Sequence, residues 1–223
     1  MRNNNLSTAT MIKVVQFSED WDEQRAMLEE LKRRRDLFNI EPVLRLAVDD
    51  AQHPSVRKAA AECAAAHNAA FALEWLRARA ENRFTPARER KLALQGLAAL
   101  HRPNQTLPVL EHIAGNSGGR EAKEVRAEAI RLVGKYRNLR SVGLLTVLER
   151  NPDDVISRAA RAALDRMLEE HGGRRAVTQK MLDRAEMLEA RGDWQGAREV
   201  LQVATRLEPN NGKLLLKLAR MAA

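Results

Sequence analysis

The chain has 223 residues, of which 44% are hydrophobic and 30% are charged, and its formal net charge at pH 7 is +8. This composition is typical of a folded protein and excludes an intrinsically disordered chain. A single cysteine, Cys63, excludes an intramolecular disulfide framework and a cysteine-rich zinc site, and it favours a reducing compartment.

The basic excess is concentrated in the middle of the chain. Residues 51–150 carry 17 Lys and Arg against 9 Asp and Glu, an excess of eight. A local excess of this kind attracts acidic partners, whether protein segments or nucleic acid, but it carries no information about the fold.

The N-terminal segment has no unbroken apolar run of signal-peptide length, and no window of the chain approaches the roughly 18 apolar residues of a membrane span. We therefore expect a cytoplasmic protein with a flexible lead-in over residues 1–17. Residues 18–38 are predicted to form an N-terminal capping helix, because acids open it and the run Lys32–Arg35 closes it, which suits the helix dipole. That run is also a candidate second basic patch, although such runs are more often solvated helix ends.

Residues 39–168 show helical periodicity that is broken at regular intervals by Pro, Gly and Asn, which predicts a series of helix pairs. The second helices of these pairs align as VRKAAAECA, ERKLALQGL, VRAEAIRLV and VISRAARAA, spaced by 33, 36 and 30 residues. Two helices per repeat at this period are typical of a stacked solenoid. We predict an all-α fold, a right-handed α–α superhelix (alpha solenoid) of stacked antiparallel helix pairs.

These second helices resemble HEAT repeats, in which a Pro or Asp turn precedes Val-Arg and an Ala/Leu-rich helix. Pro54-Ser55-Val56-Arg57 is the best match and Val125-Arg126 is close, whereas Glu89 replaces Val in the second unit and Ile156 replaces Arg in the fourth. The resemblance implies that the Arg at this position binds an acid or a carbonyl next door and has a structural role; the residues concerned are Arg57, Arg90 and Arg126.

After residues 169–177, which we expect to be a linker, residues 178–211 resemble one tetratricopeptide repeat of 34 residues. The residues at its marker positions are Ala185, Gly192, Trp194, Ala197, Leu201, Ala204 and Pro209. Residues 212–223 begin like the next first helix and are expected to form a C-terminal capping helix, because a lone repeat cannot bury its apolar face. A carboxylate clamp for chaperone tails would have Lys and Asn at the inner positions of this repeat. Leu182, Glu186 and Glu189 stand there instead, which argues against such a clamp.

No catalytic, cofactor or metal constellation is predicted. Cys63 and His67 have the spacing of a thiolate–imidazole pair, but Cys63 lies among alanines and is expected to pack as a small buried residue. The other histidines lack ligand spacing, and Ala114–Glu121 lacks the strand and the Lys-Ser/Thr of a phosphate loop. We predict that the protein is not an enzyme. Because some HEAT-like families catalyse, a HEAT-like enzyme such as a DNA glycosylase or a bilin lyase is kept as a remote alternative.

The resemblance to HEAT repeats implies that the second helices line a concave face, so their charges decide what binds there. Six side chains are candidates for a partner-binding basic strip on this face: Lys58, Lys91, Lys123, Arg131, Lys135 and Arg137. We predict a scaffold or adaptor whose basic strip receives an acidic segment of a protein partner, alone or within a larger assembly. The alternative is nucleic-acid binding without sequence readout. Scarce aromatic side chains for base stacking, and the resemblance to tetratricopeptide repeats, favour a protein partner.

Overall fold

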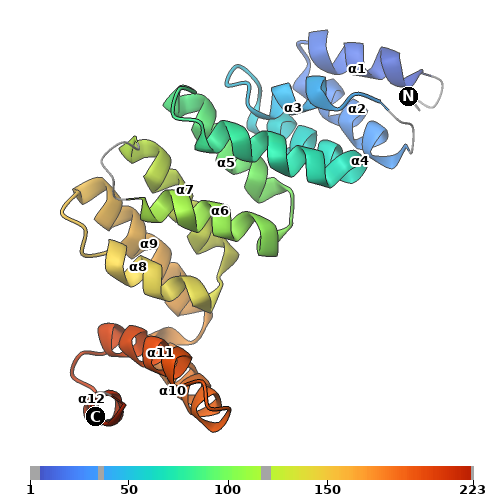
Figure 1. Ribbon diagram of the computed structural model, residues 1–223. Coiled ribbons are helices and arrows are strands. Elements are labelled where there is room, and N and C mark those ends of the chain that lie inside the picture. Colours follow the sequence, from blue (N-terminus) through green and yellow to red (C-terminus); the bar gives the residue numbers. More distant parts are fainter. Residues whose placement is uncertain (1–5, 35–37, 117–121, 222–223) are drawn as a thin grey trace. The chain divides into compact units, whose positions relative to one another are not determined.

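The computed structural model describes residues 6–34, 38–116 and 122–221, and within these residues the chain is helical and contains no strand (Figure 1). The predicted all-α class is confirmed, and the packing of helix on helix is consistent with a helical repeat. The chain divides into two compact units, residues 1–132 and 133–223, with the boundary inside one helix. The hand of the superhelix stays a prediction.

The first unit contains α1 (Thr8–Phe17), α2 (Trp21–Arg33), α3 (Glu41–Ala47), α4 (Pro54–Glu81), α5 (Ala87–Ala99), α6 (Pro103–Gly115) and most of α7 (Lys123–Tyr136). The second unit contains the end of α7, the 3-10 turn η1 (Leu139–Ser141), α8 (Val142–Leu148), α9 (Asp154–Glu170), α10 (Gly173–Ala190), α11 (Trp194–Leu207) and α12 (Gly212–Arg220). The most extensive helix packing is that of α4 with α5, α2 and α3 in the first unit, and of α10 with α11 and α8 with α9 in the second.

Helix α1 occupies residues for which the sequence predicts a flexible lead-in. Met11 and Val15 of α1 are fully buried, and Gln24 of α2 donates from Nε2 to the carbonyl oxygen of Val15 at 2.9 Å. The lead-in prediction is therefore wrong for residues 8–17, because packing on α2 stabilises a helix whose own sequence signal is weak. Residues 1–5 lie outside the described residues.

Helix α2 occupies most of residues 18–38, where the sequence predicts the N-terminal capping helix, but α1 precedes it and packs against it. It begins after Asp20, whose Oδ1 accepts from the backbone N–H of Asp22 at 2.9 Å. This is the usual chemistry of an N-cap aspartate. Its buried apolar side chains, on a helix that packs against α4, are Met27, Leu28 and Leu31.

Helix α4 runs without a loop through a position where the sequence predicts the end of one helix and the start of the next. The backbone breaks at Asn68, with φ −151° and ψ 86°. Its Oδ1 accepts from the N–H of Phe71 at 3.1 Å, so Asn68 caps the second half of α4 as it would cap a separate helix. The predicted boundary between the helices is thus correct in position, but a kink replaces the turn.

The arginines of the HEAT-like motif bind backbone carbonyls of the preceding helix or loop. Each donates from its guanidinium: Arg57 to Gln52 O at 2.5 Å, Arg90 to Ala80 O at 2.8 Å, and Arg126 to Ala114 O at 3.3 Å. Ala80 and Ala114 lie in the last turns of α4 and α6, where helix carbonyls lack partners within the helix. The structural role predicted for these three arginines is confirmed.

The segment between α9 and α10 is shorter than the linker predicted at residues 169–177. Helix α9 ends at Glu170 and α10 begins at Gly173, so two residues connect them. Gly172 has φ 90°, which glycine adopts without strain, and the imidazole of His171 hydrogen-bonds the carbonyl oxygen of Arg137 at 2.9 Å. Most of the predicted linker is therefore helical, because the glycine pair turns the chain within two residues.

Helices α10, α11 and α12 follow the tetratricopeptide-like pattern. The predicted packing positions are fully buried, namely Ala185, Ala197, Leu201 and Ala204. In α12, Leu214 is fully buried, whereas Leu215 and Leu216 are exposed. Helix α12 thus closes the repeat with one apolar residue and presents others to solvent.

Candidate partner-binding surfaces

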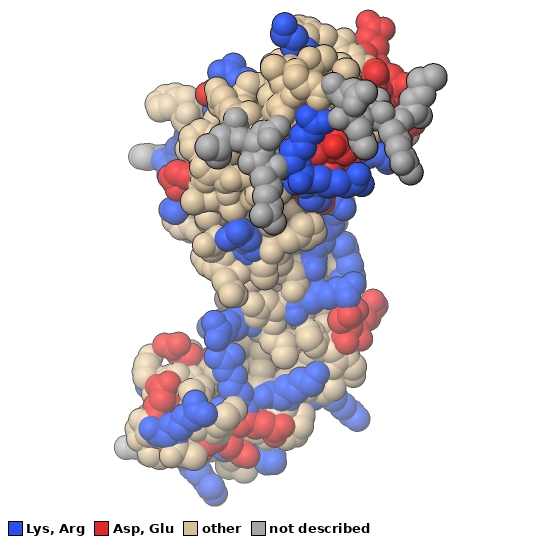
Figure 2. Space-filling view, turned by 90° about the vertical axis from the view of Figure 1, so that its right-hand side faces the viewer, with Lys and Arg blue, Asp and Glu red and all other residues tan. Residues whose placement is uncertain are grey.

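The six cations of the predicted basic strip fall into two groups. Lys58 of α4, Lys91 of α5, and Lys123 and Arg131 of α7 belong to the first unit. Lys135 and Arg137 belong to the second unit. Figure 2 shows a face on which Lys and Arg side chains gather with Asp and Glu side chains among them. The charge available to a partner therefore depends on which cations are already paired.

Glu62 of α4 contacts Lys58 at one end of the strip, together with Lys32 and His101, which are not members of the strip. Its carboxylate lies 2.9 Å from Lys32 Nζ, 3.6 Å from Lys58 Nζ and 3.4 Å from His101 Nε2. Burial of Glu62 opposes its ionisation, but the hydrogen bonds from Lys32 and His101 and the charges of Lys32 and Lys58 outweigh burial and lower the pKa of Glu62. Lys58 is 64% exposed, so it is the member of this cluster that solvent and a partner can reach.

Glu128 of α7 binds another cation of the strip, Arg131. Arg131 donates from Nε to Glu128 Oε2 at 2.7 Å and from Nη2 to Oε1, and Gln95 of α5 donates to Oε1 at 2.8 Å. The hydrogen bonds to Glu128 and its negative charge raise the pKa of Arg131. In the second unit, Arg137 Nη1 lies 2.5 Å from Glu170 Oε1. Three of the six predicted cations, Lys58, Arg131 and Arg137, thus form ion pairs with carboxylates of their own unit.

The other three cations of the strip are Lys91, Lys123 and Lys135. Lys91 is half-buried and has no ion pair within residues 6–34, 38–116 and 122–221. Lys123 and Lys135 are exposed. At least three of the six cations of the strip are therefore paired with carboxylates, and the role of the strip in binding stays a prediction.

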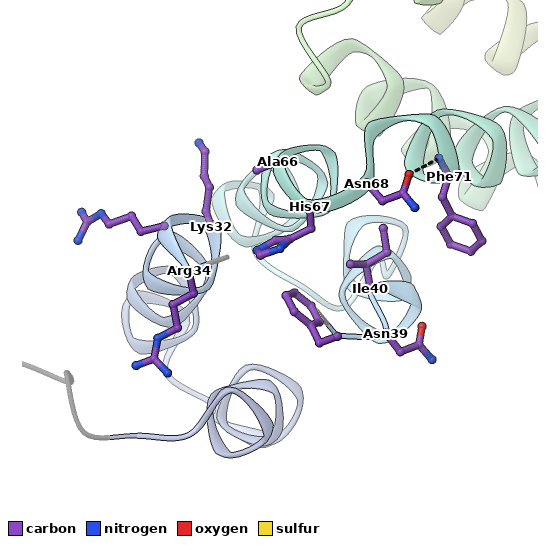
Figure 3. Close-up of a pocket in the computed structure, with 10 residues that line it drawn as sticks. Lys32, Arg34, Asn39, Ile40, Ala66, His67, Asn68 and Phe71 are labelled. Atoms are coloured by element: carbon purple, nitrogen blue, oxygen red, sulfur yellow. Dashed lines mark hydrogen bonds between the residues drawn. The ribbon is translucent and has the colours of Figure 1, made fainter. Parts of the chain in front are cut away.

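A cavity of about 550 Å³ lies where the end of α2 meets the break in α4 (Figure 3). Lys32 and Arg34 line it, but Figure 3 shows them pointing in opposite directions from the end of α2. Lys32 binds Glu62, and Arg34 donates to the carbonyl oxygen of Leu6 at 2.7 Å. The basic run at the end of α2 therefore holds neighbouring elements and does not converge on an anion; Arg35 lies outside the described residues.

Cys63 and His67 do not form a reactive pair. Cys63 is fully buried, and burial raises the pKa of its thiol to about 12, so the thiolate is scarce at neutral pH. The ring of His67 hydrogen-bonds the carbonyl oxygen of Leu31 at 2.7 Å and meets the ring of Phe38 edge-on at 4.5 Å. Both side chains are used in packing.

Among the residues that the structure describes, no three His, Cys, Asp or Glu side chains are grouped so that they could hold a metal ion. None of the described helices combines the length and the apolar character needed to cross a bilayer.

The second unit contains a groove of about 690 Å³ between α10 and α12. Trp194 and Leu216 line it and are 64% and 66% exposed. Lys217 of α12 lies 3.0 Å from Glu186 Oε1 and 3.3 Å from Glu189 Oε2, both on α10. These ion pairs tie α12 to α10 and fix one wall of the groove.

Two cations at the groove have no such partner. Lys213 and Arg220 line it and form no ion pair in the described part of the chain. Of the groove residues, the sequence indicated Glu186 and Glu189 as inner positions of the repeat, and Trp194 as a marker of its turn. The sequence did not indicate Lys213, Lys217, Arg220 and Leu216 as groove residues. The alternation of Lys, Leu and Arg in α12 could have done so, because it marks an amphipathic helix with a second, exposed apolar side.

Residues 181–221 match the family model described as tetratricopeptide repeat. This segment is a tetratricopeptide-type repeat. It includes most of α10, all of α11 and α12, and every residue that lines the groove. The chain has no match among curated proteins or among solved structures. The resemblance of residues 39–168 to HEAT repeats stays a prediction.

Proposed function

We propose that the protein is a non-enzymatic helical-repeat scaffold and that a segment of a protein partner binds in the groove between α10 and α12. Tetratricopeptide repeats typically serve protein–protein interaction. The observation that supports the proposal most strongly is that the matched repeat contains a groove with two large, exposed apolar side chains, Trp194 and Leu216.

The chemistry of the groove suits a peptide with an apolar anchor. Aromatic side chains that become buried on binding contribute most to affinity when polar groups surround them. Trp194 and Leu216 supply the apolar centre, and Lys213 and Arg220 supply a positively charged rim. The pairs between Lys217 and the two glutamates of α10 hold the rim in place before a partner arrives, which reduces the entropy lost on binding.

A displayed library of random peptides, selected against the full chain, tests this proposal. Trp194→Ser with Leu216→Ser should abolish binding of the selected peptides, and the melting curve should not change because both side chains are exposed. The matched control is Met187→Ser with Leu215→Ser, which removes exposed apolar side chains of α10 and α12 that do not line the groove. Selected peptides that bind both double variants as well as wild type would overturn the proposal.

The basic strip of the first unit is a second candidate surface, for an acidic protein segment or for nucleic acid. Lys58 is 64% exposed and Lys91 has no ion pair among the described residues, whereas the pairing of Arg131 with Glu128 reduces the positive potential that phosphates would meet. Fluorescence anisotropy with labelled oligonucleotides at about 50 and 200 mM salt separates the alternatives, since several phosphate contacts would weaken affinity by orders of magnitude. Saturable, salt-sensitive binding that is lost in Lys58→Glu with Lys91→Glu would favour nucleic acid.

A further inference from the structure

The second unit has another pocket, of about 220 Å³, where η1 and α8 meet α10 and α11. Three cations line it: Arg140 of η1, and Lys180 and Arg184, which lie one turn apart on α10. Lys180 and Arg184 lie on roughly the opposite side of α10 from Glu186 and Glu189, because successive residues of a helix are rotated by about 100°. This Arg140–Arg184 pocket is thus a separate surface from the groove.

The cations of this pocket have no carboxylate partner among the described residues. Arg140, Lys180 and Arg184 form no ion pair across residues 122–221, in contrast to Arg131 and Arg137 of the basic strip. The one acid that lines the pocket, Glu199, accepts a hydrogen bond from Gln195 at 2.8 Å. Lys180 makes a long contact of 3.4 Å to the carbonyl oxygen of His171. The pocket therefore has an excess of positive charge that no carboxylate of the described residues neutralises.

The rest of the pocket is apolar. Met181 of α10 and Val200 and Val203 of α11 line it between the charged side chains. A Cβ atom at Gly143 of α8 would lie 2.9 Å from Val203 Cγ2, so the glycine allows α8 and α11 to approach closely here. A ligand that suits this pocket combines a negative charge with an apolar group.

We propose that the Arg140–Arg184 pocket binds an acidic peptide segment of the partner, with a carboxylate held by Arg140 and Arg184 and an adjacent apolar side chain on Met181, Val200 and Val203. Guanidinium groups bind carboxylates through charge-assisted hydrogen bonds, which favours Asp or Glu as the anion. This inference rests on the proposed scaffold function and assigns the acidic partner to a place different from the basic strip.

Fluorescence anisotropy of the full chain with a labelled peptide of alternating Glu and Leu tests the inference. Two control peptides replace Glu by Gln or Leu by Ser. Arg140→Glu with Arg184→Glu should weaken binding of the Glu–Leu peptide about tenfold or more, because both carboxylate contacts become repulsive. The matched control, Arg175→Glu with Arg198→Glu, makes the same charge change at exposed arginines of α10 and α11 outside the pocket and should leave affinity within about twofold.

The inference predicts that the Gln peptide and the Ser peptide both bind more weakly than the Glu–Leu peptide. It is overturned if the Glu–Leu peptide does not bind saturably, if the Gln peptide binds as well, or if the two double variants lose affinity equally. Its failure is distinct from failure of the scaffold proposal, because library peptides that depend on Trp194 and Leu216 would still be selected. Melting curves of both charge-reversed variants should match wild type, since all four arginines are exposed.

Discussion

Arg90 donates from Nε to the carbonyl oxygen of Ala80 at 2.8 Å, and its side chain is 3% exposed. The bond joins the first turn of α5 to the last turn of α4, which is the connection between a first and a second helix of one predicted pair. A buried guanidinium is stable only when its donors are satisfied, and the end of a helix supplies carbonyls that have no partner within the helix.

Arg90→Gln should lower the free energy of unfolding by about 2 kcal/mol, because the shorter side chain leaves the carbonyl of Ala80 without its buried donor. Arg88→Gln is the matched control two residues away. Arg88 is exposed and pairs with Asp50, so its loss should change stability by about 0.5 kcal/mol or less. Urea unfolding measures the free energy of unfolding of both variants. Equal losses would show that the buried bond to Ala80 contributes no more to stability than the exposed ion pair of Arg88 with Asp50.

Gly134 lies where α7 and α9 are in backbone contact. A Cβ atom at this position would lie 2.7 Å from Ala163 Cβ and 3.0 Å from Ala163 Cα. Gly134→Ala is therefore expected to destabilise the second unit by about 1–3 kcal/mol, because the helices must separate. Gly212→Ala is the control, since its Cβ would meet nothing within 4 Å, and it should not lower the melting temperature.

The Glu62 cluster predicts a pH-dependent contribution to stability. The pKa of Glu62 is lowered in the folded protein, so its contribution is present above the unfolded value of about 4.3 and is lost as the pH falls through the folded value. Glu62→Gln should lower the free energy of unfolding by about 1 kcal/mol at pH 7. The difference from wild type should narrow below about pH 4. A difference that stays constant from neutral pH to pH 3 would contradict the assigned ion pairs.

Core and surface substitutions in the first unit should separate folding from binding. Leu97→Asp or Leu132→Asp places an unpaired charge at a buried position and should cost about 3–5 kcal/mol. Lys58→Glu with Lys91→Glu should change stability by about 1 kcal/mol or less, because Lys58 is exposed and Lys91 has no carboxylate partner within the described residues. Circular dichroism melts distinguish the outcomes. If both kinds of change unfold the chain, the assignment of the strip to the surface is wrong.

The sequence could predict the features that depend on a short local motif. The repeated Val-Arg motif placed the structural roles of Arg57, Arg90 and Arg126, and the small residues of the terminal repeat placed Ala185, Ala197 and Ala204 in the core. Helix α1 was missed because its stability comes from burial of Met11 and Val15 on a neighbouring helix. Tertiary contacts of this kind leave little trace in a single short segment.

The surfaces were harder to predict than the helices. Whether a cation is available depends on carboxylates that are far away in the sequence, such as Glu62 for Lys32 and Glu170 for Arg137, 30 and 33 residues apart. The same holds for the Arg140–Arg184 pocket, whose walls come from four helical elements. Charge counts along the chain located the basic excess, but they could not show which charges were already paired.

Hydrogen–deuterium exchange of the full chain, with and without a library-selected peptide, tests the central claim most directly. If a partner segment binds in the groove of the tetratricopeptide-type repeat, exchange should slow in α12 and in the part of α10 that carries Glu186 and Glu189. The Trp194→Ser with Leu216→Ser variant should lose this protection. Protection confined to α4, α5 and α7, with α12 unchanged, would contradict the account and assign binding to the basic strip.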